Sequence, residues 1–317
     1  MSLNSPLVLN LLSSWLTCFD LCALRILNRW FLNEVPRQTK ELTVYNLTNL
    51  SFMKQLCKIF PHVWRLRIQD AFLHEPTPMK SLVPWLNQLS ELKELELIKI
   101  TCVSGFDANL LTKEITKVTI QHCYQVQEPT IISSSIDTLI IQHCPVFQFH
   151  INTSLPQLKK LSLSSRNLTT LQCQNLITKL LSKSPLLEYF NLTGCSQLEE
   201  IVLEIRDIPA LRQFDLSACS MLHRVHLSSE CIETLLLSPN LNLQYVNLDL
   251  KSIVNLDVSF LKNLTHLSIH SPSLQHLNLR GCDQLKRETT NLNCPNLHSI
   301  VLQGTKLTLD DLSKPGL

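Results

Sequence analysis

The sequence predicts an α/β solenoid, in which short repeats stack so that one strand of each repeat joins a curved parallel sheet. Two observations predict this fold. Leucine accounts for 65 of the 317 residues, which is far above ordinary usage. The pattern apolar-x-x-apolar-x-apolar also recurs at intervals of 21 to 29 residues, a period typical of repeats that each hold one strand and one return segment.

Twelve segments fit this pattern, with a mean spacing of about 23.5 residues between successive starts. The third and fifth residues after each start are apolar and are expected to point inward, while the residues between them face water. Each repeat can bury its apolar edge only by stacking on its neighbours. The segments start at Thr39, Val63, Leu92, Ile115, Ile136, Leu158, Leu187, Leu211, Ile232, Ile253, Leu274 and Leu297.

A second signature follows each predicted strand, eight residues after the repeat start. Five cysteines and one asparagine take this place: Cys123, Cys144, Cys195, Cys219, Asn240 and Cys282. Cysteines at one fixed place in a repeat would stack as equivalents, so we expect reduced thiols rather than a disulfide framework. A buried group at this place would satisfy turn amides and carbonyls.

The return segments change along the chain. Residues 50–60, 79–89 and 170–183 have apolar spacings that fit a helix, although Pro84 must bend or start one. After about residue 187 the returns are shorter and carry a second apolar triplet. We expect these triplets to form extended segments on the convex side, over residues 198–203, 222–227, 243–248 and 264–269.

On these residues the chain resembles a leucine-rich-repeat solenoid over residues 37–306, followed by a short tail at 307–317. The cysteine at the turn is similar to the cysteine-containing subclass of this repeat found in F-box proteins. The resemblance implies a curved parallel sheet of about twelve repeats whose concave face binds a protein partner.

Residues 1–36 precede the repeats and resemble an F-box, with a Leu-Pro-like start, a Ser-x-Leu-like helix, an Asp-Leu-x-x-Leu second helix and a basic-aromatic end. The Leu and Pro of the start are reversed, and Val8 stands where an acidic residue is usual. The resemblance implies binding to the Skp adaptor of an SCF-type ubiquitin ligase. The residues implied are Pro6, Leu7, Leu11, Leu12, Trp15, Leu16, Asp20, Leu21, Leu24 and Leu27. A helical cap on the first repeat and a signal segment are the alternatives.

The outward positions of the predicted strands give the candidate substrate-binding residues. They combine charged, aromatic and hydrogen-bonding side chains, and Tyr and Arg are enriched at binding hot spots. The candidates are Arg65, Arg67, Glu94, Glu96, Tyr189, Asp215, Asp257, His276 and Arg280. Apolar residues at outward positions could form contact spots on the same face: Ile98, Ile140, Leu236 and Val301.

Composition argues against several other functions. The net charge of +2 does not favour nucleic-acid binding. With only 5 glycines and no Gly-x-Ser-x-Gly or phosphate-loop motif, we expect no enzyme and no cofactor. Two His and two Cys could in principle ligate zinc, in Gln121-His122-Cys123 and Gln142-His143-Cys144. Their cysteines belong to the buried turn position, so no metal is expected. Asp20 and Arg25 interrupt the apolar residues 7–27, which argues against a membrane span.

The sequence therefore predicts a non-catalytic substrate-recognition adaptor, with a Skp-type adaptor and a cullin ligase as partners and a protein substrate on the concave face. A plain leucine-rich-repeat scaffold with a helical cap, including a bacterial effector, is the alternative; a secreted receptor ectodomain is a third. The expected location is cytoplasmic or nuclear, or the host cytoplasm for an effector.

Overall fold

The computed structural model describes residues 37, 39–45, 50–71, 77–78, 83–100, 103–104, 114–124, 130–131, 134–146, 150–151, 155–205 and 210–312. The chain divides into two compact units, residues 1–145 and 146–317, hereafter the N-terminal and C-terminal units. The F-box-like segment 1–36, with all of its predicted adaptor-binding residues, lies outside the described residues.

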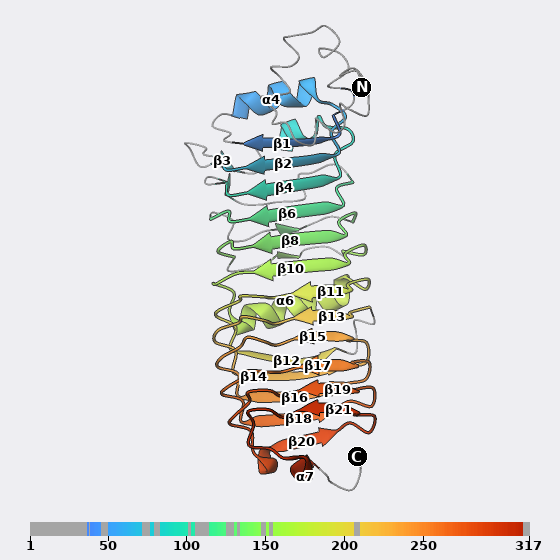
Figure 1. Ribbon diagram of the computed structural model, residues 1–317. Coiled ribbons are helices and arrows are strands. Elements are labelled where there is room, and N and C mark those ends of the chain that lie inside the picture. Colours follow the sequence, from blue (N-terminus) through green and yellow to red (C-terminus); the bar gives the residue numbers. More distant parts are fainter. Residues whose placement is uncertain are drawn as a thin grey trace, which may run out of the picture. The chain divides into compact units, whose positions relative to one another are not determined.

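In both units a strand begins two residues after each predicted repeat start, and these are called the first-sheet strands. The N-terminal unit has five of them, which pair in parallel in chain order (Figure 1). Their inward side chains, such as Leu66, Ile68 and Leu95, are fully buried. The strands are β1 (Glu41–Tyr45), β2 (Arg65–Gln69), β4 (Glu94–Ile98), β6 (Lys117–Gln121) and β8 (Thr138–Gln142).

Two helices form return segments of the N-terminal unit. Helix α4 (Leu50–Ile59) confirms the helix expected there and buries Met53 and Leu56, which are three residues apart on one face. Helix α5 (Val83–Leu86) is shorter than expected, and Pro84 stands in its first turn, where the missing N–H has no intrahelical partner to lose. Short strands also lie on the returns: β3 (Thr77–Pro78) on the same return as α5, and β5 (Val103–Ser104) and β7 (Thr130–Ile131) on the next two.

The first-sheet strands of the C-terminal unit form two parallel groups. The rings of Phe190 and Phe214 stack between neighbouring strands at 5.4 Å, which fills the core where leucine is replaced by a larger residue. The first group is β10 (Lys160–Ser164), β11 (Tyr189–Asn191), β13 (Gln213–Asp215) and β15 (Thr234–Leu236). The second is β17 (Asn255–Asp257), β19 (His276–Asn278) and β21 (Ser299–Val301).

The short returns of this unit form a second parallel sheet, hereafter the return sheet. All four predicted second triplets are strands, and their inward residues, such as Ile201 and Val225, are buried. A fifth strand, β20, was not predicted. The return sheet holds β12 (Glu200–Ile205), β14 (Arg224–Ser229), β16 (Tyr245–Leu250), β18 (His266–His270) and β20 (Thr290–Asn293) (Figure 1).

Helix α6 (Thr170–Lys183) covers the residues predicted for it. Thr169 and Gln172 form a capping box, in which the Thr169 N–H donates to Gln172 Oε1 at 2.9 Å. The remaining elements of the unit are β9 (His150–Ile151), the 3-10 turn η3 (Arg287–Thr289) and α7 (Leu309–Leu312). No helix in the described ranges combines the length and the apolar character needed to cross a bilayer.

Most described turns that follow a first-sheet strand pass through a left-handed backbone conformation seven residues after the repeat start; those after β10 and β15, at Ser165 and Pro239, do not. Glycine takes this place at Gly194, Gly281 and Gly304, but Ala218 and Phe260 also adopt it, with φ of 56° and 58°. The N-terminal unit uses polar residues there: Asp70, Lys99, His122 and His143. The position therefore tolerates a Cβ at a cost of about 1 kcal/mol.

Gly281 is expected to be less tolerant than its equivalents. A Cβ there would lie 2.9 Å from Phe260 Cδ1, whereas a Cβ at Gly304 would meet nothing nearer than 3.4 Å. We expect Gly281→Ala to lower the free energy of unfolding by about 2 kcal/mol and Gly304→Ala by about 1 kcal/mol. Urea denaturation followed by circular dichroism measures both, and equal losses would contradict the contact with Phe260.

Candidate functional site

The four charged candidates of the N-terminal unit form an ion-pair network across β2 and β4. Register pairs Arg65 with Glu94 and Arg67 with Glu96. The Arg65 guanidinium donates to Glu96 Oε1 at 2.7 Å, and Arg67 Nε donates to Glu96 Oε2 at 2.6 Å. Glu94 lies 3.5 Å from Arg65 and 3.5 Å from Lys117 on the next strand. The structure thus brings these residues together, but as partners of one another.

Glu96 is the centre of this network, with only 4 % of its side chain exposed. Burial opposes the charged carboxylate, but hydrogen bonds from Arg67 and Arg65 outweigh burial and lower the pKa of Glu96. With Glu41 at 3.6 Å from Arg65, the network holds three carboxylates and three cations. Its charges balance, so this face presents little net field to a partner.

The C-terminal unit places its candidates differently. Tyr189 lies at the start of β11, where its hydroxyl accepts a hydrogen bond from Asn191 Nδ2 at 2.9 Å. Asp215 lies at the end of β13, and its Oδ1 accepts from the Ser217 N–H at 2.9 Å and the Ser217 hydroxyl at 2.6 Å. Asp215 therefore closes the turn after its own strand.

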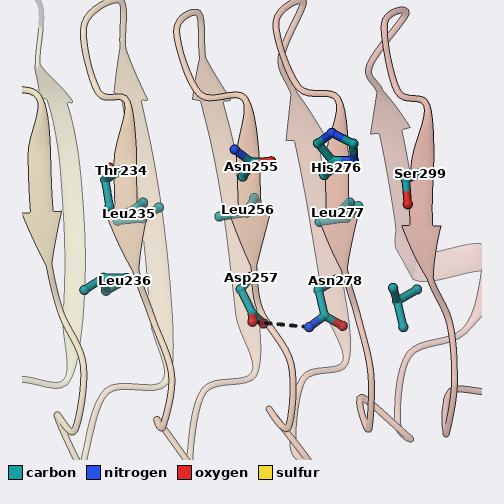
Figure 2. Close-up of a pocket in the computed structure, with 11 residues that line it drawn as sticks. Thr234, Leu235, Leu236, Asn255, Leu256, Asp257, His276, Leu277, Asn278 and Ser299 are labelled. Atoms are coloured by element: carbon teal, nitrogen blue, oxygen red, sulfur yellow. Dashed lines mark hydrogen bonds between the residues drawn. The ribbon is translucent and has the colours of Figure 1, made fainter.

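Asp257 and His276 line an open groove of about 250 Å³ on the outward face of β15, β17, β19 and β21 (Figure 2). One row of side chains across the groove is polar: Thr234, Asn255, His276 and Ser299. The other row mixes apolar and polar groups: Leu236, Asp257, Asn278 and Val301. Leu236 and Val301 keep 47 % and 41 % of their surface exposed, so the groove offers both apolar contact and hydrogen-bonding groups.

Asp257 is the carboxylate of this groove. Its Oδ1 accepts from the Ser259 N–H at 2.8 Å, and its Oδ2 accepts from Asn278 Nδ2 at 3.2 Å (Figure 2). Partial burial opposes the charge, but the bonds from Ser259 and Asn278 outweigh it and lower the pKa of Asp257. The groove therefore carries a negative charge at neutral pH.

Arg280 lies in the turn beyond β19 and is not among the residues that line the groove. Its guanidinium carbon is 5.5 Å from the centre of the Phe260 ring, a cation–π contact. Phe260 is half exposed at a left-handed turn position. The sequence predicted the outward placement of Arg280 but not its contact with the turn of the preceding repeat.

The turn cysteines are buried thiols that donate to backbone. Cys219 Sγ donates to the Leu192 carbonyl at 3.3 Å, and Cys282 Sγ donates to the Val258 carbonyl at 3.1 Å. Burial raises the pKa of Cys219 to about 12 and that of Cys282 to about 11. Such thiols are poor nucleophiles at neutral pH.

The two His-Cys pairs considered as zinc ligands do not direct their four side chains to one point. His122 and His143 stack at 4.5 Å between ring centres, while the buried Cys123 and Cys144 thiols donate to the Leu97 and Ile120 carbonyls. Across the described ranges, no group of three or more His, Cys, Asp or Glu side chains could hold a metal ion.

Sequence reasoning missed an aromatic and cationic ladder on the return sheet. Register aligns Arg224, Tyr245 and His266 on neighbouring strands. The Arg224 guanidinium lies 5.3 Å from the Tyr245 ring, which stacks on His266 at 4.6 Å. The signal was available, because the three residues share one position in the second apolar triplets.

Parallel strands at the repeat period, a buried turn residue and a return segment define each unit as a solenoid of the leucine-rich-repeat type. No family model and no curated protein matches the chain. The chain is similar to a chain of the Rad7–Elc1 complex of yeast, at 17 % identity and a TM-score of 0.37, over 98 % of this chain and 90 % of that one.

It is also similar to the internalin InlF of Listeria monocytogenes, at 16 % identity and a TM-score of 0.43, over 89 % of this chain and 86 % of that one. A third similarity is to a chain of the TLR13–ssRNA13 complex, at 14 % identity and a TM-score of 0.39 over 86 % of this chain. The chain spans about half of that protein, 52 %. Similarities this low carry no function over to this chain.

Proposed function

We propose that the chain is a non-catalytic recognition protein that binds a protein substrate on the outward face of its first-sheet strands. The observation that carries this proposal is the groove on β15, β17, β19 and β21, where exposed Leu236 and Val301 lie beside Asn255 and His276. Apolar contact surface beside hydrogen-bonding groups on one exposed face is typical of a protein interface. Solenoids use such extended faces for partners.

We further propose that residues 1–36 link this recognition surface to a ubiquitin ligase by binding a Skp-type adaptor, which holds a cullin ligase near the substrate. Support for this step comes from the F-box-like order of residues in that segment. This chain would raise the effective concentration of the substrate at the ligase, and it would need no catalytic residue of its own for that role. The raised pKa of Cys219 and of Cys282 makes these two turn thiols poor nucleophiles, which is compatible with this role.

Co-expression with a Skp adaptor, followed by size-exclusion chromatography, tests the ligase link. We expect co-elution with the unchanged chain and its loss in the Leu16→Asp/Leu24→Asp variant, because charge on the apolar face of the segment would oppose packing on the adaptor. The Leu186→Asp/Leu241→Asp variant adds the same charges at two exposed leucines of the C-terminal unit and serves as the control.

Separate elution of the unchanged chain would overturn the ligase link. The chain would then be a binding scaffold, with residues 1–36 as a cap, and the groove would remain its binding surface. Equal loss in the control variant would also count against the face assigned to Leu16 and Leu24.

A further inference from the structure

We propose that the groove of the C-terminal unit binds a basic, lysine- or arginine-containing segment of its protein partner. This inference rests on the proposed function and names the chemistry of the substrate. One row of groove side chains runs from Leu236 on β15 through Asp257 and Asn278 to Val301 on β21. On β13, register pairs Asp215 with Leu236. Asp215 and Asp257 therefore flank Leu236, about 10 Å apart at ordinary strand spacing.

The two carboxylates lack the cation partners that balance the N-terminal unit. In that unit, Arg65, Arg67 and Lys117 neutralise the carboxylates of neighbouring strands. In the part of the chain that the structure describes, neither Asp215 nor Asp257 forms an ion pair. Arg280, in the turn after β19, lies over the Phe260 ring instead. Asp257 in the groove and Asp215 on the adjoining strand β13 thus carry two negative charges without a cation partner among the described residues.

These charges exceed what the turns require. Asn191 and Asn278 occupy the same repeat position as Asp215 and Asp257, and each amide oxygen accepts the N–H two residues later, at 2.6 and 3.0 Å. Asparagine therefore closes this turn as well as aspartate does. Each carboxylate accepts one further hydrogen bond, Asp215 from the Ser217 hydroxyl at 2.6 Å and Asp257 from Asn278 Nδ2 at 3.2 Å, but both donors are uncharged, so the negative charge is available for a partner.

The apolar part of the row fits the same occupant. Lysine and arginine lay their aliphatic stems on apolar surface while the charged head reaches a polar group. Leu236, exposed between the two carboxylates, and Val301, beyond Asn278, offer that surface. An acidic segment would meet Asp257, whose pKa is already lowered, and would be repelled.

Fluorescence anisotropy with two labelled nonapeptides tests this inference. One is Gly-Lys-Leu-Lys-Gly-Lys-Leu-Lys-Gly, and the other has glutamate in place of each lysine. Binding is measured at pH 8, where histidines are ordinarily neutral, in 50 and 300 mM salt. We expect the lysine peptide to bind, the glutamate peptide not to bind, and the affinity to fall with salt.

The Asp215→Asn/Asp257→Asn variant removes both charges and keeps the turns. We expect it to weaken lysine-peptide binding about tenfold or more. The Asp283→Asn/Asp310→Asn variant makes the same change in net charge at exposed sites outside the groove and should bind like the unchanged chain. Equal weakening in both variants would show a diffuse charge effect and overturn the assignment to the groove.

Absence of lysine-peptide binding, or binding of the glutamate peptide, would also overturn the inference. The proposed function is judged separately. Co-elution with the Skp adaptor depends on Leu16 and Leu24, so it can succeed while the peptide experiment fails, and the reverse. If the adaptor binds and the lysine peptide does not, the recognition role stands and the basic partner is wrong.

Discussion

Replacing Asn240 with alanine is expected to lower the free energy of unfolding of the C-terminal unit by about 3 kcal/mol. Asn240 is fully buried. Its Oδ1 accepts the Cys219 N–H at 2.7 Å, and its Nδ2 donates to the Leu216 carbonyl at 2.9 Å and to the Leu237 carbonyl. Alanine would leave three buried backbone groups without partners, and each such group costs about 1 kcal/mol or more.

Asn242→Ala is the matched control in the same repeat. Asn242 is exposed, and its Nδ2 donates to a single carbonyl, that of Ser220, at 2.7 Å. Water can replace this bond, so we expect a loss below about 1 kcal/mol. Asn240→Cys should fall between the two, because cysteine at the equivalent Cys219 still donates to the preceding repeat, to Leu192.

Urea denaturation followed by circular dichroism measures these differences, and hydrogen exchange of the peptide that contains Cys219 locates them. Faster exchange is expected at Cys219 in Asn240→Ala, since its N–H loses its acceptor. If Asn240→Ala cost no more than Asn242→Ala, the turn position would not carry the stability assigned to it.

The strands could be predicted from the sequence because each depends on a short local pattern. Inward apolar residues three and five places after each start are enough to mark a strand, and β14 and β16 followed from the same rule. Strand β20 could not be predicted this way. Its residues Thr290–Asn293 are mostly polar, and it forms because β18 offers an edge for pairing.

The site was predicted only in part, because its residues were considered singly. Aligning the repeats places Arg67 and Glu96 at the same repeat position on neighbouring strands, so their ion pair could have been predicted from the sequence. The serines two residues after Asp215 and Asp257 likewise indicate turns closed by the aspartates. The groove itself depends on side-chain volumes across β15, β17, β19 and β21, and no local pattern reports those volumes.

Glu96→Gln is expected to destabilise the N-terminal unit by about 3 kcal/mol at pH 7. The variant leaves Arg65 and Arg67 facing each other without the carboxylate that both contact at 2.6–2.7 Å. Glu94→Gln is the control, because Glu94 is more exposed and its ion-pair partners lie 3.5 Å away. We expect Glu94→Gln to lower the free energy of unfolding by less than about 1 kcal/mol. Tryptophan fluorescence reports on this unit, since all 4 tryptophans lie at or before Trp85.

The effect of Glu96→Gln should depend on pH in a defined direction. The folded-state pKa of Glu96 lies below the unfolded value, which is about 4.3 for glutamate. Its contribution is therefore complete above about pH 4.3 and is lost as the pH falls through the folded-state pKa. The difference in unfolding free energy between the unchanged chain and Glu96→Gln should be full at pH 7 and shrink below pH 4.

The triple variant Arg65→Met/Glu96→Met/Arg67→Met separates two explanations of the loss. Glu96→Gln could destabilise the unit because Arg65 and Arg67 lose the carboxylate of Glu96. In that case, removing all three charges should recover most of the stability, since apolar replacements of a buried ion pair are often neutral. If the attraction itself stabilises the fold, the triple variant should be as unstable as Glu96→Gln. We expect partial recovery, because no cation is left without Glu96 but the margin by which the Arg65 and Arg67 hydrogen bonds outweigh the burial of Glu96 is lost.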